Sequence, residues 1–252
     1  MTETHQQATA VIPAYNEAPD IKNVLNPLQQ VAAVQQIIVV DDGSTDDTSG
    51  VVDAYARAHT ATPIRLLTLD RNMGKGGALM AGIQASCSDL LLLLDADLHR
   101  LQPDHIDALM QPVRKRRAEM ALGIFRKGRY QTNWSHRYFS FLSGQRCLRW
   151  PAFRRAAHLR PGALARSRWG IEVALNLIAR QQNLTIHQVP WEGVTHTMRL
   201  EKMSGLKKYW TYIDMWTDIL KFAIRFRLHL WATKRHTRAW RRQPTHHSPT
   251  TK

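Results

Sequence analysis

The fold of this chain is decided by the stretch Asp89-Leu90-Leu91-Leu92-Leu93-Leu94-Asp95-Ala96-Asp97. Five consecutive leucines are too few to span a bilayer and are typical of a strand buried on both faces of a parallel sheet. The strand would deliver the carboxylates of Asp95 and Asp97 to its carboxyl end. In an extended backbone both would point to the same side. Two hard oxygen ligands suit a divalent cation, although an isolated Asp-x-Asp is more simply explained as a polar turn.

Apolar runs alternate with helical patterns along the first 98 residues. Strands are expected at 9–13, 37–40, 64–69 and 90–94, with a helix after each of the first three. This alternation predicts an α/β fold with a doubly wound, mostly parallel sheet. Ligands bind beyond the carboxyl ends of the strands in such sheets. Polar segments follow all four strands, so we expect them to meet on one rim, which favours ligand binding at the Asp-x-Asp over a plain turn. These segments are 13–17, 41–44, 72–75 and 95–97.

The charge of the chain is unevenly distributed. The net charge is +15. Residues 1–98 carry 5 basic and 12 acidic side chains, a net −7, and residues 99–252 carry 30 basic and 8 acidic ones, a net +22. A basic region of this strength suggests phosphates, an anionic membrane surface or nucleic acid as a partner, and it does not choose between them.

The cellular compartment is suggested by features that the sequence lacks. It has only two cysteines, Cys87 and Cys147, which implies no disulfide framework and favours a reducing compartment. The first residues do not show the basic and apolar pattern of a signal peptide. No run of 18 apolar residues is present, so we expect no transmembrane helix.

Four segments, in order and spacing, resemble the family 2 glycosyltransferases, which have the nucleotide-diphospho-sugar-binding GT-A fold. The resemblance covers about residues 8–196 and includes members similar to dolichyl-phosphate mannosyltransferase and to glucosyl-3-phosphoglycerate synthase. The resemblance implies a nucleoside diphosphate sugar as substrate. The four matching segments are Val11-Ile12-Pro13-Ala14-Tyr15-Asn16-Glu17, Val40-Asp41-Asp42-Gly43-Ser44-Thr45-Asp46, Asn72-Met73-Gly74-Lys75-Gly76 and Leu94-Asp95-Ala96-Asp97.

The resemblance also implies roles for individual residues. Asp97 would be catalytic, because it would bind a Mg²⁺ or Mn²⁺ ion that bridges the diphosphate and offsets its charge as it leaves. The implied nucleotide-sugar-binding residues are Pro13, Tyr15 and Glu17 at the base and ribose, Asp42 at the base, Lys75 beside the nucleotide, and Asp95 with Ala96 at the ribose or sugar.

Two later segments extend the resemblance. Trp169-Gly170-Ile171-Glu172 is similar to an acceptor-side region of the family, so Glu172 is a second catalytic candidate, either binding the donor sugar or acting as the acceptor base. Its simpler role is that of an acidic residue at a helix N-terminus. Gly193-Val194-Thr195-His196 resembles a segment in which a histidine joins the metal, which makes His196 a candidate third ligand beside its alternative as a surface histidine.

Two departures from the family argue against a processive synthase. Three residues separate Gln145 from Arg149, so the Gln-x-x-Arg-Trp motif is not matched, and Glu172 is followed by Val173 instead of aspartate. Arg146 and Arg149 are expected to bind an acceptor phosphate, because guanidinium groups bind phosphate bidentately. A solvated basic face is the alternative for this pair.

The last part of the chain is expected to form an amphipathic helix. Residues 209–231 place three tryptophans near one stripe beside several arginines, a pattern that suits an interfacial helix on anionic lipid. Packing on the catalytic domain or on a homodimer partner are the alternatives. The expected organisation is a GT-A catalytic domain at 8–205, the amphipathic extension at 206–235 and a basic, disordered tail at 236–252.

Together these features predict a non-processive hexosyltransferase that uses a membrane-associated acceptor such as polyprenyl phosphate. We expect it in the cytoplasm, peripherally attached to the inner face of the cytoplasmic membrane. A soluble phosphorylated acid is the alternative acceptor. A basic nucleic-acid-binding protein is the alternative class, but the acidic first 98 residues do not need such a role, and we do not expect nucleic acid as a partner.

Overall fold

The computed structural model describes residues 7–126, 145–157 and 170–196, together with Thr217, Leu220, Lys221 and Ile224. The sequence also predicts a basic, glycine-containing loop at 126–133 and a helix at 134–142. Most of that loop, the helix at 134–142, most of the helix at 209–231 and the tail at 236–252 lie outside the described residues. The elements are β1 (Ala8–Ala14), α1 (Lys22–Leu28), β2 (Val34–Asp41), α2 (Thr48–Ala58), β3 (Ile64–Thr68), α3 (Gly74–Ala85), β4 (Leu90–Leu93), β5 (Leu98–His99), α4 (Pro103–Arg114), β6 (Met120–Arg126), β7 (Arg146–Arg149), α6 (Trp150–Ala157), α8 (Ile171–Gln181), β8 (Ile186–Glu192) and β9 (Thr195–His196).

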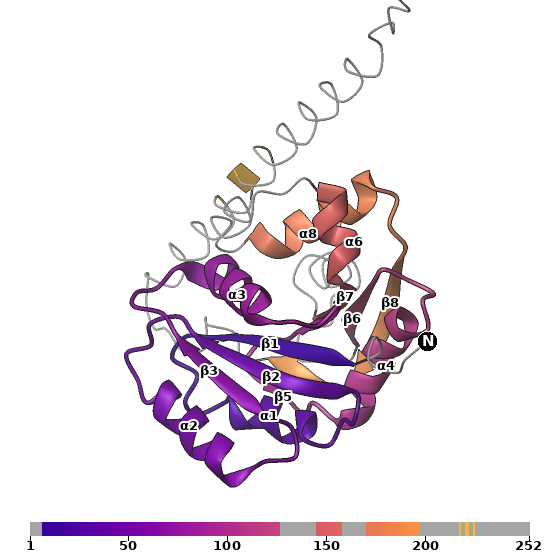
Figure 1. The fold of residues 1–252 in the computed structure, drawn as a ribbon. Helices are drawn as coiled ribbons and strands as arrows, with labels where there is room; N and C mark the ends of the chain where they lie inside the picture. The colour runs from indigo at the N-terminus through magenta and orange to yellow at the C-terminus, as the bar shows by residue number, and fades with distance from the viewer. Residues whose placement is uncertain are drawn as a thin grey trace, which may run out of the picture.

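A seven-stranded sheet with the order β3-β2-β1-β4-β7-β6-β8 forms the centre of the described structure (Figure 1). β1 runs parallel to β2 and β4, β2 runs parallel to β3, and β6 runs parallel to β8. β7 is antiparallel to both of its neighbours, β4 and β6. A separate two-stranded sheet pairs β5 with β9. The predicted α/β fold with a mostly parallel sheet is confirmed, and β7 is its exception.

The leucine run lies at the centre of this sheet as β4, between β1 and β7. All four of its residues are buried. Leu90 and Leu92 belong to the apolar core on one face, and Leu91 and Leu93 belong to the core on the other. The strand is therefore buried on both faces, as predicted, but it ends at Leu93, one residue earlier than the leucine run suggested.

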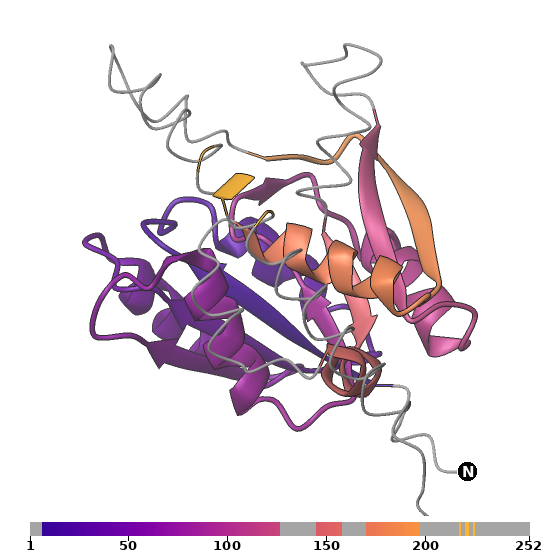
Figure 2. The same cartoon turned by 90° about the horizontal axis from the view of Figure 1, so that it is seen from above.

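Helices cover both faces of the sheet (Figures 1 and 2). Apolar side chains of α1, α2 and α4 pack on one face, and those of α3, α6 and α8 pack on the other. α3 approaches the sheet closely at Gly82, where a Cβ atom would lie 2.3 Å from Cγ1 of Val11. At its other end, the first turn of α3 lies close to the residues that follow β4, because Lys75 contacts Asp95 there.

Two boundaries in the second half of the chain test the apolar pattern. The apolar pattern of Ile171 to Ala179 predicts a helix, which is α8 and continues to Gln181. The alternation from Leu184 to Val189 predicts a strand, which begins only at Ile186, as β8. No helix within the described parts of the chain is both long and apolar enough to cross a membrane.

Candidate active site

The loops that follow β1 and β2 are tied together at the rim by Asn16. Its side-chain oxygen accepts a hydrogen bond from the N–H of Thr45 at 2.8 Å, and its own N–H donates to Oγ of Ser44 at 2.9 Å. The φ angle of Asn16 is +57°, a left-handed conformation that asparagine tolerates better than most residues. The sequence motif contained Asn16, but no role was predicted for it. Its position between two loops is a property that strand and helix patterns do not reveal.

Asp42 connects the segment 72–75 before and at the start of α3 to the loops that follow β1 and β2. Its N–H donates to the carbonyl of Ala14 at 2.8 Å, and its Oδ1 accepts a hydrogen bond from the N–H of Met73 at 2.6 Å. The next residue, Gly43, has a φ of +69°, and a Cβ there would lie 3.0 Å from the backbone of Arg71. Glycine is therefore required for this close approach. The carboxylate of Asp42 is engaged with the chain just before α3.

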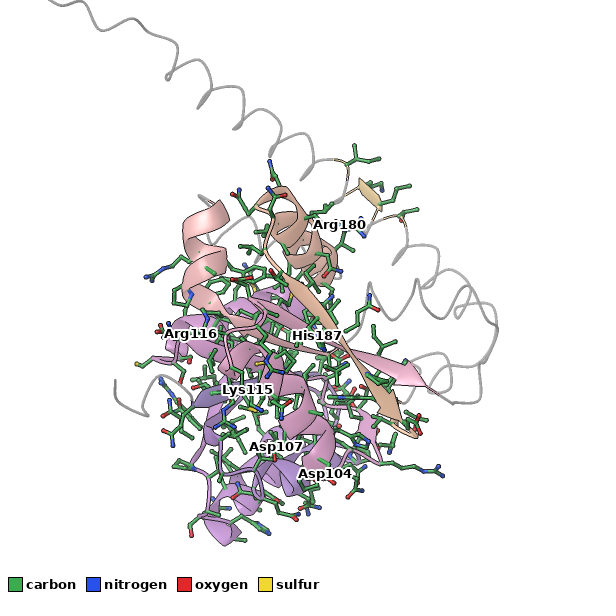
Figure 3. All side chains as sticks on the ribbon, turned by 90° about the vertical axis from the view of Figure 1, so that its right-hand side faces the viewer. Asp104, Asp107, Lys115, Arg116, Arg180 and His187 are labelled. Carbon is green, nitrogen blue, oxygen red and sulfur yellow. The ribbon has the colours of Figure 1, made fainter. Side chains whose placement is uncertain are left out.

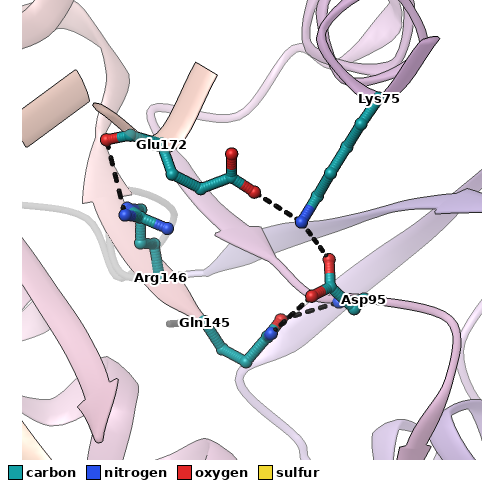
Figure 4. A network of polar contacts seen from close by, with 5 residues as sticks. All are labelled: Lys75, Asp95, Gln145, Arg146 and Glu172. Carbon is teal, nitrogen blue, oxygen red and sulfur yellow. Dashed lines mark hydrogen bonds and ion pairs between the residues drawn. The ribbon is translucent and has the colours of Figure 1, made fainter. Parts of the chain in front are cut away.

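Lys75 connects the two halves of the sheet at this rim (Figure 4). It lies in the first turn of α3, and its ammonium contacts Oδ1 of Asp95 at 2.5 Å and also the carboxylate of Glu172. Asp95 follows β4, while Glu172 belongs to the first turn of α8. The Glu172 side chain is 8% exposed and that of Lys75 is 19% exposed. Asp95 and Glu172, which are 77 positions apart in the chain, are thus joined by one cation.

The ion pairs in this cluster outweigh the cost of burial. Burial alone would raise the pKa of the Asp95 carboxyl, but the charge and hydrogen bond of Lys75 hold that pKa below its usual value. Gln145 and His196 contribute in the same direction. Burial alone would lower the pKa of the Lys75 ammonium, but Asp95 and Glu172 raise it above its usual value. Charged partners are what makes such buried groups stable in their ionised forms.

Gln145 and Arg146 contact the same cluster from β7. The Oε1 atom of Gln145 accepts from the N–H of Asp95 at 2.7 Å, and its Nε2 donates to Oδ2 of Asp95 at 2.8 Å. Arg146 is 2% exposed, and its guanidinium donates to the main-chain carbonyl of Glu172 at 3.4 Å. Arg146 therefore supports Glu172 from inside the protein. No role was predicted for Gln145, because nothing in its local sequence distinguishes a glutamine that faces a distant aspartate.

The structure does not bring Arg149 to this cluster. Arg146 lies opposite Leu93, at the carboxyl end of β4, but Arg149 lies opposite Leu90, at the other end. The guanidinium of Arg149 donates to the carbonyl of Val113 in α4 at 2.7 Å. The two arginines are three residues apart on a strand, so they also face opposite sides of the sheet. The expected pairing of Arg146 and Arg149 in a single phosphate clamp does not agree with this geometry.

The remaining predicted nucleotide contacts lie on or near the same rim. Pro13 is the next-to-last residue of β1 and pairs with Val40 of β2. Tyr15 follows β1 and is half-buried. Glu17 is 9% exposed, and its N–H donates to Oγ1 of Thr48 at 2.9 Å. Ala96, which is 4% exposed, belongs to the turn after β4.

Asp97 and His196 are brought together by the small sheet of β5 and β9. Leu98, the neighbour of Asp97, pairs with His196 in this sheet. Ala96 and Asp97 form a turn, so the extended backbone assumed for Asp95 and Asp97 is not present. His196 contacts Phe125 with a separation of 5.6 Å between ring centroids. The placement of Asp97 near His196 thus depends on the β5–β9 pairing and not on alternation along one strand.

Asp97 and His196 offer donors that Mg²⁺ or Mn²⁺ accepts, a carboxylate and an imidazole. Within the residues that the structure describes, no group of three or more His, Cys, Asp or Glu side chains is arranged to hold a metal ion. Magnesium sites commonly combine one or two protein ligands with substrate phosphates and water. The residues present therefore fit a cation that binds together with a phosphorylated substrate, and they do not form a complete protein cage.

Comparison with known proteins identifies relatives over most of the chain. The dolichyl-phosphate beta-glucosyltransferase of Mus musculus is 27% identical over 93% of this chain and 80% of its own length. The undecaprenyl-phosphate 4-deoxy-4-formamido-L-arabinose transferase of Sodalis glossinidius is 36% identical over 42% of this chain and 33% of its own length.

The fold is also found in solved structures. Glucosyl-3-phosphoglycerate synthase from Mycobacterium tuberculosis, in complex with Mn²⁺, UDP and glucosyl-3-phosphoglycerate, matches with a TM-score of 0.65 and 20% identity, over 88% of this chain and 80% of that one. The same synthase with Mg²⁺ and UDP matches with a TM-score of 0.58. The sequence model of the family described as Glycosyl transferase family 2 matches residues 9–167, which include the rim segments and β7. With its fold, its rim and this match over more than half of its length, the chain belongs to glycosyl transferase family 2.

Proposed function

We propose that this glycosyltransferase moves one hexose from a nucleoside diphosphate sugar to a polyprenyl phosphate, with Mg²⁺ or Mn²⁺ as cofactor. The relatives that match over most of the chain are dolichyl-phosphate beta-glucosyltransferases, and undecaprenyl-phosphate transferases match over a shorter part of it. Both kinds are named for a polyprenyl phosphate acceptor. UDP-glucose is the donor to try first, because solved structures of the same fold contain it.

The ion pair between Glu172 and Lys75 is the observation that favours a phosphate acceptor over a hydroxyl acceptor. A hydroxyl acceptor requires a base that takes up its proton. The carboxylate of Glu172 is already the ion-pair partner of Lys75, so it is poorly placed to serve as that base. A phosphate monoester loses its second proton with a pKa of about 6, so it is already an oxyanion nucleophile at neutral pH. A polyprenyl phosphate therefore needs no base from this site.

The residues of the site would then have separate roles. Asp97 and His196 would hold the cation, which when bound offsets the charge of the leaving nucleoside diphosphate. Asp95 would accept hydrogen bonds from hydroxyl groups of the ribose or the sugar. Lys75 forms ion pairs with the carboxylates of Asp95 and Glu172, and it holds the pKa of Asp95 below its usual value, so that Asp95 would remain a hydrogen-bond acceptor for the donor.

Exposed apolar side chains support an attachment to the membrane surface. Leu220 is 61% exposed and Ile224 is 53% exposed, and both are helical. They are four residues apart, so they lie on the same face of a helix, within the proposed extension 206–235. Lys221 beside them is exposed, and residues 99–252 carry a net charge of +22. An apolar face flanked by positive charge suits the surface of an anionic bilayer.

The first experiment measures sugar transfer from UDP-glucose to dolichyl phosphate in the presence of Mn²⁺, with wild type, Asp97→Asn and Asp107→Asn. Asp107 is an exposed residue of α4, away from the rim, and serves as the matched control (Figure 3). We expect Asp97→Asn to lower kcat/KM about 100-fold or more, since metal charge stabilisation is worth several kcal/mol. Equal activity of the two variants would contradict the role of Asp97.

The acceptor is tested in the same assay by replacing dolichyl phosphate with 3-phosphoglycerate. Transfer to dolichyl phosphate alone is expected. Transfer to 3-phosphoglycerate alone would replace the proposed acceptor with a soluble phosphorylated acid and would leave the donor and the family unchanged.

Membrane attachment is tested by sedimentation with liposomes that contain phosphatidylglycerol. We expect the double variant Leu220→Ser, Ile224→Ser to leave a larger fraction in the supernatant than wild type, because apolar burial drives interfacial binding. A variant with only Lys221→Ser should lose less, and only at low salt, because its contribution is electrostatic. Unchanged sedimentation of the double variant would assign this face to protein packing or a dimer.

A further inference from the structure

Gln145 makes a two-point contact with Asp95 across the sheet. Gln145 is almost fully buried, with 4% of its surface exposed. One end of its amide accepts a hydrogen bond from the Asp95 N–H at 2.7 Å, and the other end donates to Asp95 Oδ2 at 2.8 Å (Figure 4). The two residues are 50 positions apart in the chain. A two-point contact fixes an orientation, which a single hydrogen bond does not.

This contact takes the place of a backbone hydrogen bond just beyond the point where the pairing of β4 with β7 ends. β4 pairs with β7 as far as Leu93, which lies opposite Arg146. The N–H of Leu94 still donates to the carbonyl of Val11 on the other side, at 3.2 Å. The N–H of Asp95 lies beyond both ladders, and the side chain of Gln145 supplies its acceptor. Without that acceptor a partly buried N–H would lose its partner, which is costly.

Gln145 is itself held in place by its own backbone. Its carbonyl accepts a hydrogen bond from the N–H of Gly123 in β6 at 2.7 Å. The next residue, Arg146, is the first residue of β7. The amide is therefore presented from a backbone position that is hydrogen-bonded to β6 just before β7, and it contacts Asp95 from there.

The consequence for Asp95 is a division of its two carboxylate oxygens. Oδ2 receives the amide of Gln145 and Oδ1 receives the ammonium of Lys75. The carboxylate cannot rotate about its last bond without losing one of these partners. Gln145 is neutral, so it fixes the carboxylate without adding a charge, and Lys75 remains the cation that links Asp95 to Glu172.

We propose that Gln145 is a positioning residue that locks the Asp95 carboxylate in the orientation in which it meets the hydroxyl groups of the nucleoside diphosphate sugar. The inference rests on the proposed function of the site. It predicts that Gln145 acts on the donor and not on the acceptor, because both of these side-chain hydrogen bonds go to Asp95.

The test compares Gln145→Met with Gln29→Met. Methionine has nearly the length of glutamine but neither donates nor accepts these hydrogen bonds. Gln29 is a matched control, because its amide also makes a two-point contact with one distant residue, here with backbone groups alone: Nε2 donates to the carbonyl of Thr62 at 2.9 Å, and Oε1 accepts from its N–H at 2.8 Å. That contact joins the end of α1 to the loop before β3, away from Asp95. Both variants lose two hydrogen bonds, but only one of them frees Asp95.

Steady-state kinetics with UDP-glucose and dolichyl phosphate give the expected separation. For Gln145→Met we expect kcat/KM for the donor to fall about 10-fold to 100-fold, as for the loss of a hydrogen bond to a charged group. The KM for dolichyl phosphate should stay within about twofold of wild type. Gln29→Met should lower the thermal unfolding midpoint by about as much as Gln145→Met does. It should leave kcat/KM for the donor and the KM for dolichyl phosphate within about twofold of wild type.

A second variant, Gln145→Glu, covers the case in which the methionine variant does not fold. Glutamate keeps the size of the side chain and an acceptor for the Asp95 N–H, but it places a carboxylate against Oδ2 of Asp95. We expect its donor KM to be raised more than that of Gln145→Met. A glutamate variant that matches wild type in donor KM would overturn the inference.

The outcomes separate the inference from the function on which it rests. Wild-type transfer with a donor-specific loss in the Gln145 variants supports both. Wild-type transfer with the same kinetics in Gln145→Met and Gln29→Met overturns the positioning role alone. No transfer by wild type from any nucleoside diphosphate sugar, with Mg²⁺ or Mn²⁺, overturns the proposed function and the inference with it.

Discussion

The two halves of the sheet contribute to the site in different ways. In the half formed by β1 to β4, the strands are parallel, and polar residues follow their carboxyl ends, where short loops are tied together by Asn16 and Asp42. In the other half, β7 is antiparallel, so its beginning and not its end lies at the rim. This half supplies buried side chains, Gln145, Arg146 and Glu172, that reach the rim from within. In the proposed function, the first half would build the surface for the ligand, and the second half would fix the groups on that surface.

Removal of Lys75 should have the largest effect, because this residue joins the halves. Lys75→Met leaves the carboxylates of Asp95 and Glu172 close together without their cation. We expect kcat/KM for transfer to fall about 100-fold, because removing one partner of a buried ion pair is costly. Solvent reaches part of the Lys75 side chain and keeps this cost below that of a fully buried pair. The control is Lys115→Met, at the exposed end of α4 (Figure 3).

A double variant sharpens this result. Adding Glu172→Gln to Lys75→Met removes one of the two facing carboxylates, so part of the lost activity should return. The coupling between the two positions is measured with a double-mutant cycle. Additive losses would show that the two halves act independently at the rim and would contradict the bridge.

Sequence patterns predict the first half better than the second, for a physical reason. A parallel strand places the residues after it at the rim, so Asp42, Lys75 and Asp95 could be located from strand ends alone. The start of β7 reaches the rim only because that strand is reversed, and one short apolar strand gives no sign of its direction. Arg146 and Arg149 were therefore grouped together, and the structure separates them to opposite ends of β4.

The residues that lie near Asp97 could not be predicted from strand patterns, because they are set by the pairing of β5 with β9. β5 and β9 have two residues each, too few for any apolar period. His196 was predicted near the metal from the resemblance to the family alone, and the pairing of Leu98 with His196 places it next to Asp97. Its role as a metal ligand stays a prediction. Gln145 had no pattern of its own, because its partner is a single N–H and carboxylate 50 residues away.

The reversal of β7 is tested by a pair of arginine variants with a smaller effect. Arg146→Met removes the donor to the Glu172 carbonyl, and we expect a loss of about tenfold in kcat/KM. Arg149→Met removes the donor to the Val113 carbonyl and should lower the free energy of unfolding by about 1–2 kcal/mol. Its kinetic constants should stay within about twofold of wild type. Urea denaturation and transfer assays on both variants separate stability from activity. Equal kinetic losses would mean that both ends of β7 reach the substrate.

The smallest expected effect concerns Cys147, which lies between these two arginines on β7. Cys147 is fully buried, and burial raises the pKa of its thiol to about 12, against the opposing charges of Arg149 and Arg114. Cys87 is exposed. Since only the thiolate is alkylated, iodoacetamide at pH 8 should label Cys87 alone in the folded protein, and both cysteines in urea, as counted by mass spectrometry.

The Cys147 thiol also makes the free energy of unfolding depend on pH, and the direction of this dependence follows from its raised pKa. In the unfolded chain a cysteine has a pKa of about 8.5, so between this value and about 12 the folded state holds a proton that the unfolded state has lost. The contribution of Cys147 to stability is therefore complete below about pH 8.5 and is lost as the pH rises toward 12. Urea midpoints should fall less steeply above pH 8.5 for Cys147→Ala than for wild type, and Cys87→Ala should retain the wild-type slope. Because Cys147 shares its strand with Arg146, a wild-type slope in Cys147→Ala would mean that β7 is open to water, and that its first residues cannot fix Asp95 and Glu172 from a dry interior.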